Sequence, residues 1–264
     1  MRFLIFGDVV GAPGRAAVSA ALPALREEFS PDSVIINIEN IAHGSGISPA
    51  TMQEALAWRA DAYTSGDHAW DNKKGLPLLS DPHIPLIRPA NYPTGVPGRG
   101  YLTYTSGAWR VAVINLQGQV FFKNDPDNPF HALDRLLEME DIRQADMILV
   151  DFHSEATSEA RAFGWHADGR VSAVWGTHTH VPTADAQVLP GGTGYISDAG
   201  MQGAHHSVIG ASRALVQSFL TQLKMKFDVE ENGPLEVNAV VIDVDPRSGH
   251  ATDIQQVRRV FARD

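Results

Sequence analysis

The first 72 residues alternate apolar, strand-like runs with segments of helical composition. The strand-like runs are 2–6, 32–40 and the start of 61–72, and the helical segments between them are 13–29 and 48–60. Strands that are joined through helices lie parallel in one sheet, because the chain must cross back over a face of that sheet, and the crossover is right-handed. This order therefore constrains the chain to an α/β fold with a largely parallel sheet at its N-terminal end.

Local composition predicts where the helices begin and break. Pro23 lies inside 13–29 and is expected to kink or split that helix. Ser48 followed by Pro49 is typical of a helix start. Further helices are predicted at 128–140, 154–168 and 211–227. Ser154 is expected to cap the second of these.

The second half of the chain has a more antiparallel character. Strand-like runs on both sides of Ser106 and Gly107 predict a hairpin over 100–120, and a Gly-Gly turn predicts another over 186–197. Single strands are predicted at 145–153 and 170–180, and an antiparallel pair at 235–245 and 251–261. Because no segment has the length or composition of a linker, one domain over 1–264 is expected.

Five of the predicted strand ends carry Asp, Glu, Asn or His, which can bind metal. These ends are Gly7-Asp8, Glu39-Asn40, Asp67-His68, Asp151-His153 and His178-His180. Functional residues of parallel strands gather at the carboxyl ends, so these side chains are expected to meet at one edge of one sheet. His178 and His180 are two residues apart at a strand end, so their imidazoles are expected to share a face. Each residue alone is explained by a turn, a cap or a structural histidine. Together they indicate a shared site.

The types of donor favour two metal ions. Three carboxylates, three imidazoles and one amide exceed the needs of a single tetrahedral ion. Two five- or six-coordinate divalent ions that share a bridging carboxylate would use them all, and such a pair, about 4 Å apart, can clamp a phosphate and activate a bridging water. The chain has no cysteine, which excludes zinc-thiolate sites, iron–sulfur clusters and cysteine nucleophiles.

The overall charge narrows the partners that are expected. The formal net charge is −10, whereas binding to duplex nucleic acid requires a basic face. A small phosphorylated substrate remains compatible, because bound metal ions reverse the local field. The opening residues MRFLIFGDVVG lack the longer apolar stretch and the cleavage site of a signal peptide. No apolar run approaches the roughly 20 residues of a membrane helix. A cytoplasmic location without membrane contact is therefore expected, and the chain could form a homo-oligomer.

Seven sequence blocks, in order, resemble the YmdB-like branch of the calcineurin-like metallophosphoesterases. The blocks are GDVVG (7–11), NIEN (37–40), GDHAWDN (66–72), RPANYP (88–93), DFHSEATSE (151–159), GTHTHVPTAD (176–185) and SDAGMQG (197–203), the last followed by SVIG (207–210). The resemblance implies a four-layer α/β/β/α sandwich of two mostly mixed sheets flanked by helices. It also implies two divalent or mixed-valence metal ions, with iron favoured and manganese or zinc as alternatives. The activity it implies is hydrolysis of phosphodiesters, with 2′,3′-cyclic nucleotides as suggested substrates.

The resemblance also assigns roles to residues. The ligand positions fall on Asp8, Glu39, Asn40, Asp67, His153, His178 and His180. Glu39 is expected to bridge the two ions, and Asp67 to share its ion with His153 and His178. His68 takes the position of the histidine that contacts the phosphate or protonates the leaving oxygen.

Two positions depart from the general family pattern. Val10 stands where that family has a histidine ligand, and Asp67 stands where it usually has asparagine. The extra negative charge of Asp67 favours a harder or more oxidised ion, so the identity of the metals stays open.

Several further features have more than one interpretation. Arg88 and Asn91 are candidate substrate contacts, although Arg88 could instead form an ion pair at a sheet edge. The glycine-rich segment 198–210 could form a lid, whereas His205 and His206 within it are not expected to bind metal. The leading hypothesis is a phosphodiesterase that uses a metal-bridging hydroxide with His68 as the acid. The alternative is a regulatory or ligand-sensing protein that keeps the site with little turnover.

Overall fold

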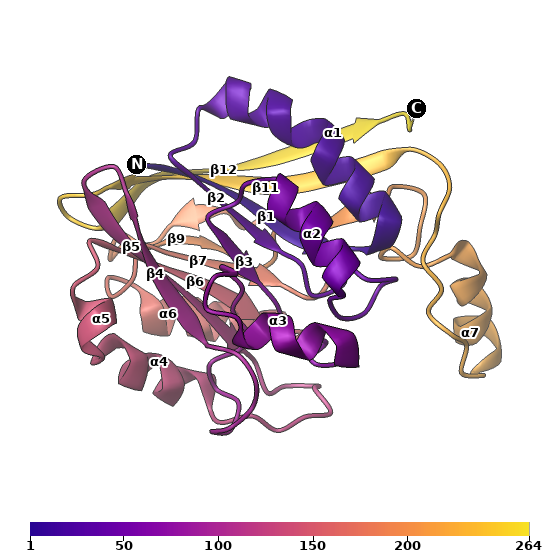
Figure 1. Ribbon diagram of the computed structural model, residues 1–264, viewed down its shortest axis with the longest axis horizontal. Coiled ribbons are helices and arrows are strands. Elements are labelled where there is room, and N and C mark those ends of the chain that lie inside the picture. Colours follow the sequence, from indigo (N-terminus) through magenta and orange to yellow (C-terminus); the bar gives the residue numbers. More distant parts are fainter. Residues whose placement is uncertain (264) are drawn as a thin grey trace.

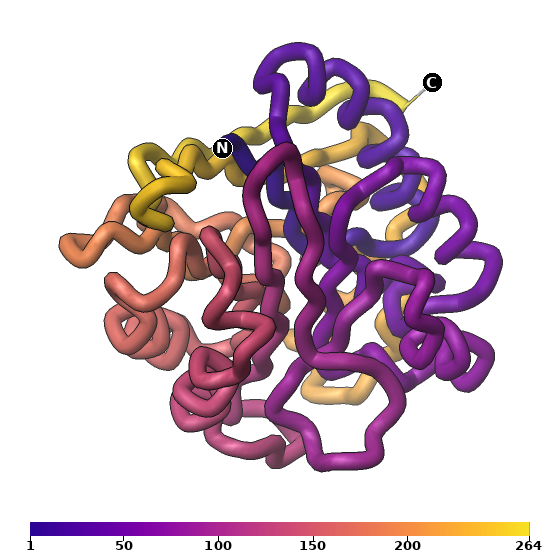
Figure 2. Tube along the Cα trace, turned by 60° about the vertical axis from the view of Figure 1, so that its left-hand side comes forward, coloured from indigo at the N-terminus to yellow at the C-terminus, as the bar shows by residue number. Residues whose placement is uncertain are grey.

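Two six-stranded mixed sheets face each other at the centre of the computed structural model, which describes residues 1–263 (Figure 1). The first sheet contains, in spatial order, β12 (His250–Phe261), β11 (Leu235–Asp245), β10 (Met201–Ala204), β1 (Arg2–Val9), β2 (Ser33–Asn37) and β3 (Ala62–Thr64). The second contains β4 (Tyr101–Ser106), β5 (Trp109–Gln117), β6 (Met147–His153), β7 (Ala173–Thr177), β9 (Gly194–Ile196) and β8 (Gln187–Val188). Figure 2 shows the hairpin of β4 and β5 from the front, at the edge of the second sheet.

Helices cover the outer face of each sheet, so the predicted α/β/β/α sandwich is confirmed (Figure 1). On the first sheet lie α1 (Gly11–Phe29) and α2 (Pro49–Ala57), and on the second lie α4 (Pro129–Leu137), α5 (Glu140–Arg143) and α6 (Thr157–Ala167). A short 3₁₀ turn (Lys73–Gly75) precedes α3 (Leu76–Ser80), and another (Arg213–Leu215) precedes α7 (Val216–Thr221), which stands apart from the sheets.

Alternation along the strands divides the interior into three apolar layers. In β1, Phe3 and Ile5 point into the core between the two sheets, whereas Leu4 and Phe6 pack toward the helices outside. Successive side chains of a strand point to opposite faces, so a strand with apolar residues at every position is buried on both sides. The core between the sheets fixes how the loops at the strand ends meet.

The early strands pair as predicted, but the prediction of a single shared edge is wrong. β1, β2 and β3 are parallel neighbours in the first sheet. β6 and β7 are parallel neighbours in the second sheet. Hydrophobic periodicity predicts that a strand is buried without predicting which sheet it joins. The polar strand ends therefore come from two sheets.

Two predicted helix details differ from the structure. α1 is one helix through Pro23, so the predicted split is wrong, whereas a kink at Pro23 stays a prediction. Pro23 and Ser19, whose carbonyl loses its helical partner, are both exposed to water. Ser154 does not cap α6, which begins at Thr157 after Ala156. Ser154 is buried, and its backbone N–H donates instead to the carbonyl of Thr177.

The region after residue 198 departs most from prediction. Met201–Ala204 forms the buried strand β10, parallel to β1 in the first sheet, so this part of 198–210 cannot be a lid. Within 211–227, helix is limited to Arg213–Leu215 and Val216–Thr221. This segment lies outside the sheets, and a short helix without tertiary packing has little to stabilise it.

Candidate metal centre

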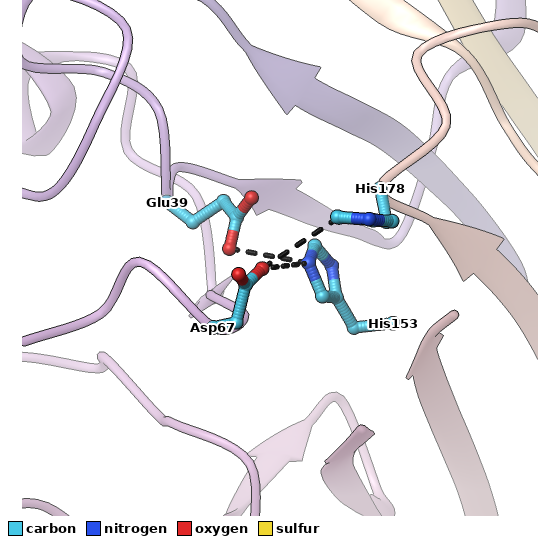
Figure 3. Close-up of side chains that lie close together, drawn as sticks. All are labelled: Glu39, Asp67, His153 and His178. Atoms are coloured by element: carbon cyan, nitrogen blue, oxygen red, sulfur yellow. Dashed lines mark hydrogen bonds and ion pairs between the residues drawn. The ribbon is translucent and has the colours of Figure 1, made fainter. Parts of the chain in front are cut away.

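Four of the predicted ligands converge from the two sheets (Figure 3). Glu39 and Asp67 follow β2 and β3, whereas His153 ends β6 and His178 follows β7. One ligand atom from each lies within 4.8 Å of all the others. His153 Nε2 is 3.1 Å from Asp67 Oδ1 and 3.3 Å from Glu39 Oε2, and His178 Nδ1 is 3.6 Å from Asp67 Oδ1. This group of oxygen and imidazole donors is suited to a divalent ion.

Gly66 allows this close approach. A Cβ atom at position 66 would lie 2.1 Å from Glu39 Oε2 and 2.3 Å from His153 Nε2, well inside van der Waals contact. Any side chain at this position would therefore displace two of the four candidate ligands.

Burial and the charges of the neighbouring residues shift the pKa values of these four residues. Burial raises the pKa of Glu39 to about 7, against the influence of His153. Burial alone would lower the pKa of His153, but the charges of Glu39 and Asp67 raise it to about 10. Burial and the neighbouring His153 lower the pKa of His178 to about 3. A cation relieves this arrangement, because it neutralises the carboxylates and takes the imidazole lone pairs.

A second set of predicted ligands lies on the other side of Glu39. Asn40 Nδ2 donates to Glu39 Oε1 at 2.9 Å and to His180 Nε2 at 3.1 Å. His180 Nδ1 donates to the carbonyl of Ile209 at 2.7 Å, so Nε2 is the nitrogen that faces the site. Glu39 thus turns one carboxylate oxygen toward each set.

The carboxylate of Asp8 also supports the presence of a cation at this site. Its Oδ2 accepts from the backbone N–H of His178 at 3.0 Å. Its Oδ1 is buried and, within residues 1–263, has no hydrogen-bond partner. A buried carboxylate oxygen without a partner costs stability, and a metal ion would satisfy it. The donor set therefore fits the metals that the sequence predicted.

The two histidines of GTHTH reach the site by a different route from the one predicted. β7 ends at Thr177, and both His178 (φ 102°) and His180 (φ 65°) have positive φ angles. The prediction that strand alternation places them on one face is therefore wrong. The carboxylate of Asp198 holds this turn, because its Oδ2 accepts from Thr179 N at 2.9 Å and from Thr179 Oγ1 at 2.8 Å.

Buried hydrogen bonds orient His153. Thr177 Oγ1 donates to Asp151 Oδ1 at 2.7 Å, so it accepts from His153 Nδ1 at 2.9 Å. Asp151 is in turn held by Asn37 and Thr64. This chain leaves the Nε2 lone pair of His153 directed at the cluster, as outer hydrogen bonds do at metal sites.

His68 lies at the rim of the cluster rather than within it. Its Nδ1 donates to Asp71 Oδ2 at 2.7 Å, and Ser45 Oγ donates to the same oxygen at 2.6 Å. Its Nε2 is 3.9 Å from Asp67 Oδ2. Burial alone would lower the pKa of His68, but the charges of Glu39 and Asp67 and the bond to Asp71 raise it. Because Asp71 accepts from Nδ1, Nε2 is the ring nitrogen that faces the cluster.

A cavity of about 380 Å³ opens onto these groups. Four of the candidate ligands (Glu39, Asn40, His178 and His180) line it together with His68, and so do Ile209 and Phe227. This volume is within the range of small-molecule sites.

Sequence reasoning missed Glu155, whose Oε2 lies 3.1 Å from His178 Nε2. It also missed Asp71, and Phe122, whose ring centroid is 4.7 Å from that of His178. Glu155 and Asp71 stand two and three residues after His153 and His68, so their motifs contained a signal. Phe122 belongs to a loop with no such signal.

Arg88 and Asn91 have structural contacts. The guanidinium of Arg88 donates to the carbonyls of Pro89 and Val96. The amide of Asn91 donates to two backbone carbonyls and accepts from Gln117 N. Neither residue lines the cavity, so substrate contact by these two stays a prediction that the geometry does not favour.

Comparison with known proteins places the chain in a family. The family model described as YmdB-like protein matches residues 4–257. Over 259 residues the chain is 43% identical to a Bacillus subtilis (strain 168) protein named 2′,3′-cyclic-nucleotide 2′-phosphodiesterase, an alignment that covers 97% of this chain and 96% of that protein. The chain belongs to the YmdB-like family.

Solved structures agree with the YmdB-like assignment. A crystal structure from Mycoplasma pneumoniae, described as a novel phosphatase, has a TM-score of 0.92 at 33% identity and covers 98% of this chain and 93% of that chain. The calcineurin-like phosphoesterase YfkN from Bacillus subtilis has a TM-score of 0.57 at 11% identity, covering 98% and 90% of the two chains, and supports the fold alone. The resemblance is confirmed, and this YmdB-like protein is a hydrolase with the calcineurin-like fold. Within residues 1–263, no helix combines the length and apolarity needed to cross a bilayer.

Proposed function

We propose that the protein is a metal-dependent phosphodiesterase that hydrolyses 2′,3′-cyclic nucleotides or related phosphodiesters. The observation that carries this proposal is the group of Glu39, Asp67, His153 and His178 beside a cavity. Glu39 and His178 line that cavity, and so does His68. The 43% identity to a protein named as a 2′,3′-cyclic-nucleotide phosphodiesterase supports the choice of substrate.

Two metal ions are part of the proposal, with iron favoured and manganese or zinc as alternatives. Asp67, His153 and His178 would hold one ion, Asp8, Asn40 and His180 the other, and Glu39 would contribute to both. Bound metals would supply Lewis acidity toward the phosphate and an activated water. The chain's own contribution is to hold these donors in a buried, preorganised group.

His68 is assigned the role of the acid. Opening of the cyclic ester forms a bond from a water oxygen to phosphorus and breaks the bond from phosphorus to an ester oxygen. That ester oxygen leaves with a developing negative charge and needs a proton. Nδ1 of His68 donates to Asp71, and Nε2 of His68 faces the cluster. Nε2 is therefore the nitrogen that can supply the proton or contact the phosphate.

The test begins with metal analysis of protein purified without chelators. The loaded protein is then assayed on bis-p-nitrophenyl phosphate and on a set of cyclic and linear nucleotides, with the same metal restored. Metal-dependent hydrolysis with a preference for cyclic nucleotides is expected. Bound metal without turnover at any pH from about 6 to 9 would favour the regulatory alternative. A cytoplasmic location also belongs to this proposal, and cell fractionation checks it.

A further inference from the structure

The segment 211–229, here called the arm, leaves the body beside the metal centre and returns to it. Its helix α7 stands apart from the sheets (Figure 1). At the base of the arm, Ala211 pairs with Val229 in an antiparallel bridge, and Ser212 N donates to the carbonyl of Asp228 at 2.8 Å. Both ends of the arm are thus fixed to each other.

The base of the arm is fitted against two glycines of the body. A Cβ on Gly11 would lie 2.9 Å from Val229 Cγ1, and a Cβ on Gly44 would lie 2.9 Å from Val229 Cγ2 and 3.5 Å from Phe227 Cε1. Both glycines also have positive φ angles, which residues with a side chain rarely adopt. A side chain at either position would therefore clash with the arm and strain the backbone. These glycines make room for the arm, and their contact with Val229 places Phe227 on the cavity wall.

Phe227 and Ile209 give the cavity an apolar wall beside its charged floor. Their side chains remain 36% and 41% exposed, so they keep a free face. The candidate ligands His178 and His180 line the same cavity. A ligand that fills such a site carries an anionic group at one end and an apolar, flat group at the other. A nucleotide has this chemistry, because its phosphate is anionic and each of its bases has a π-face.

We infer that Phe227, supported by Ile209, is the platform on which the base of a nucleotide substrate stacks. The inference rests on the proposed function and extends it, because it places the nucleoside part of the substrate against the arm. The phenyl ring offers no hydrogen-bond donor or acceptor, so the platform recognises a π-face and not a particular base. All four bases are therefore accepted, and purines bind better than pyrimidines because they present more area.

The experiment compares two cyclic diesters that share the same reacting ring. One is 2′,3′-cyclic AMP, and the other is glycerol 1,2-cyclic phosphate, which has no base. In metal-loaded protein, Phe227→Ala is expected to lower kcat/KM for 2′,3′-cyclic AMP by about 5- to 150-fold, the range of losses from removing a stacked aromatic. The loss is expected in KM, and the change on glycerol 1,2-cyclic phosphate should stay within about twofold.

Two variants complete the set. Phe227→Trp keeps an aromatic face and should restore most of the affinity for 2′,3′-cyclic AMP. Phe219→Ala is the matched control, because Phe219 is on the same arm, is 68% exposed and does not line the cavity. It should behave as wild type on both substrates. Equal losses of Phe227→Ala on both substrates, or no loss on either, would overturn the inference.

A binding measurement separates this inference from the proposed function. If wild-type protein hydrolyses neither diester, the proposed function fails, and the platform is tested by titrating 3′-AMP and inorganic phosphate into the metal-loaded protein. Weaker binding of 3′-AMP to Phe227→Ala, with phosphate binding unchanged, supports the platform. Unchanged 3′-AMP binding refutes it whatever the turnover.

Discussion

Replacing Gly66 by alanine tests whether the close approach of backbone to ligands is needed for metal binding. Ordinary van der Waals contact begins near 3.4 Å, whereas the new Cβ would lie 2.1 Å from Glu39 Oε2 and 2.3 Å from His153 Nε2. Both ligand atoms must therefore move by more than 1 Å. Distances from metal to ligand tolerate only about 0.2 Å. Gly66→Ala is thus expected to lose metal and to lower kcat by about 100-fold or more.

The assay for Gly66→Ala measures metal content by mass spectrometry, turnover of bis-p-nitrophenyl phosphate, and the thermal unfolding midpoint. Gly203→Ala is the control, because a Cβ at position 203 would lie 3.6 Å from Met201 Sδ, which is an ordinary contact. The control should match wild type in all three measurements. A Gly66→Ala protein with full metal content and wild-type turnover would refute the steric reasoning.

Three further predictions concern the ligands and the acid. Glu39→Gln removes the charge that both sets of ligands share, so metal analysis should show loss of at least one ion with the circular dichroism spectrum unchanged. His68→Ala should keep its metal and lose roughly 10²- to 10⁴-fold in rate on a cyclic nucleotide. Its loss should be smaller on a p-nitrophenyl ester, whose leaving group needs little protonation, and equal losses would remove the role as acid. His180→Ala should reduce metal content, whereas His205→Ala should not, since His205 bonds to Glu236 instead. Metal loss only in the His205 variant would contradict this map of the site.

Much of the site could be predicted from the sequence because the ends of buried strands have a recognisable residue pattern. An apolar run that stops at Asp, Glu or His marks the place where a buried strand reaches solvent, and the early strand–helix alternation predicts parallel strands. Resemblance to the family assigns Asp67, His153 and His178 to one ion, and the structure brings them together with Glu39. The prediction of an α/β/β/α fold also rests on that resemblance and not on periodicity.

Other features depend on contacts between distant parts of the chain. β10 has four residues, and its glycine-rich sequence resembles a loop until β1 and β11 pair with it. The positive φ angles of His178 and His180 depend on a carboxylate at Asp198, which no local pattern predicts. The arm lacks a core to pack against, so its helical composition overestimates its helix.

The division of the ligands between the two sheets explains why the site needs the whole fold. The first sheet supplies the carboxylates and the amide, and the second supplies the imidazoles. Brought together without metal, these groups shift one another's protonation: burial alone would lower the pKa of His153, but the charges of Glu39 and Asp67 raise it. What holds them together is the apolar core between the sheets, in which Phe3 and Ile5 of β1 pack in the same cluster as Trp175 of β7. The free energy released by burying that core offsets the cost of concentrating polar groups at its edge. A metal ion bound here would take ligands from both sheets, so the packing of the core determines the distance between the two halves of the candidate centre.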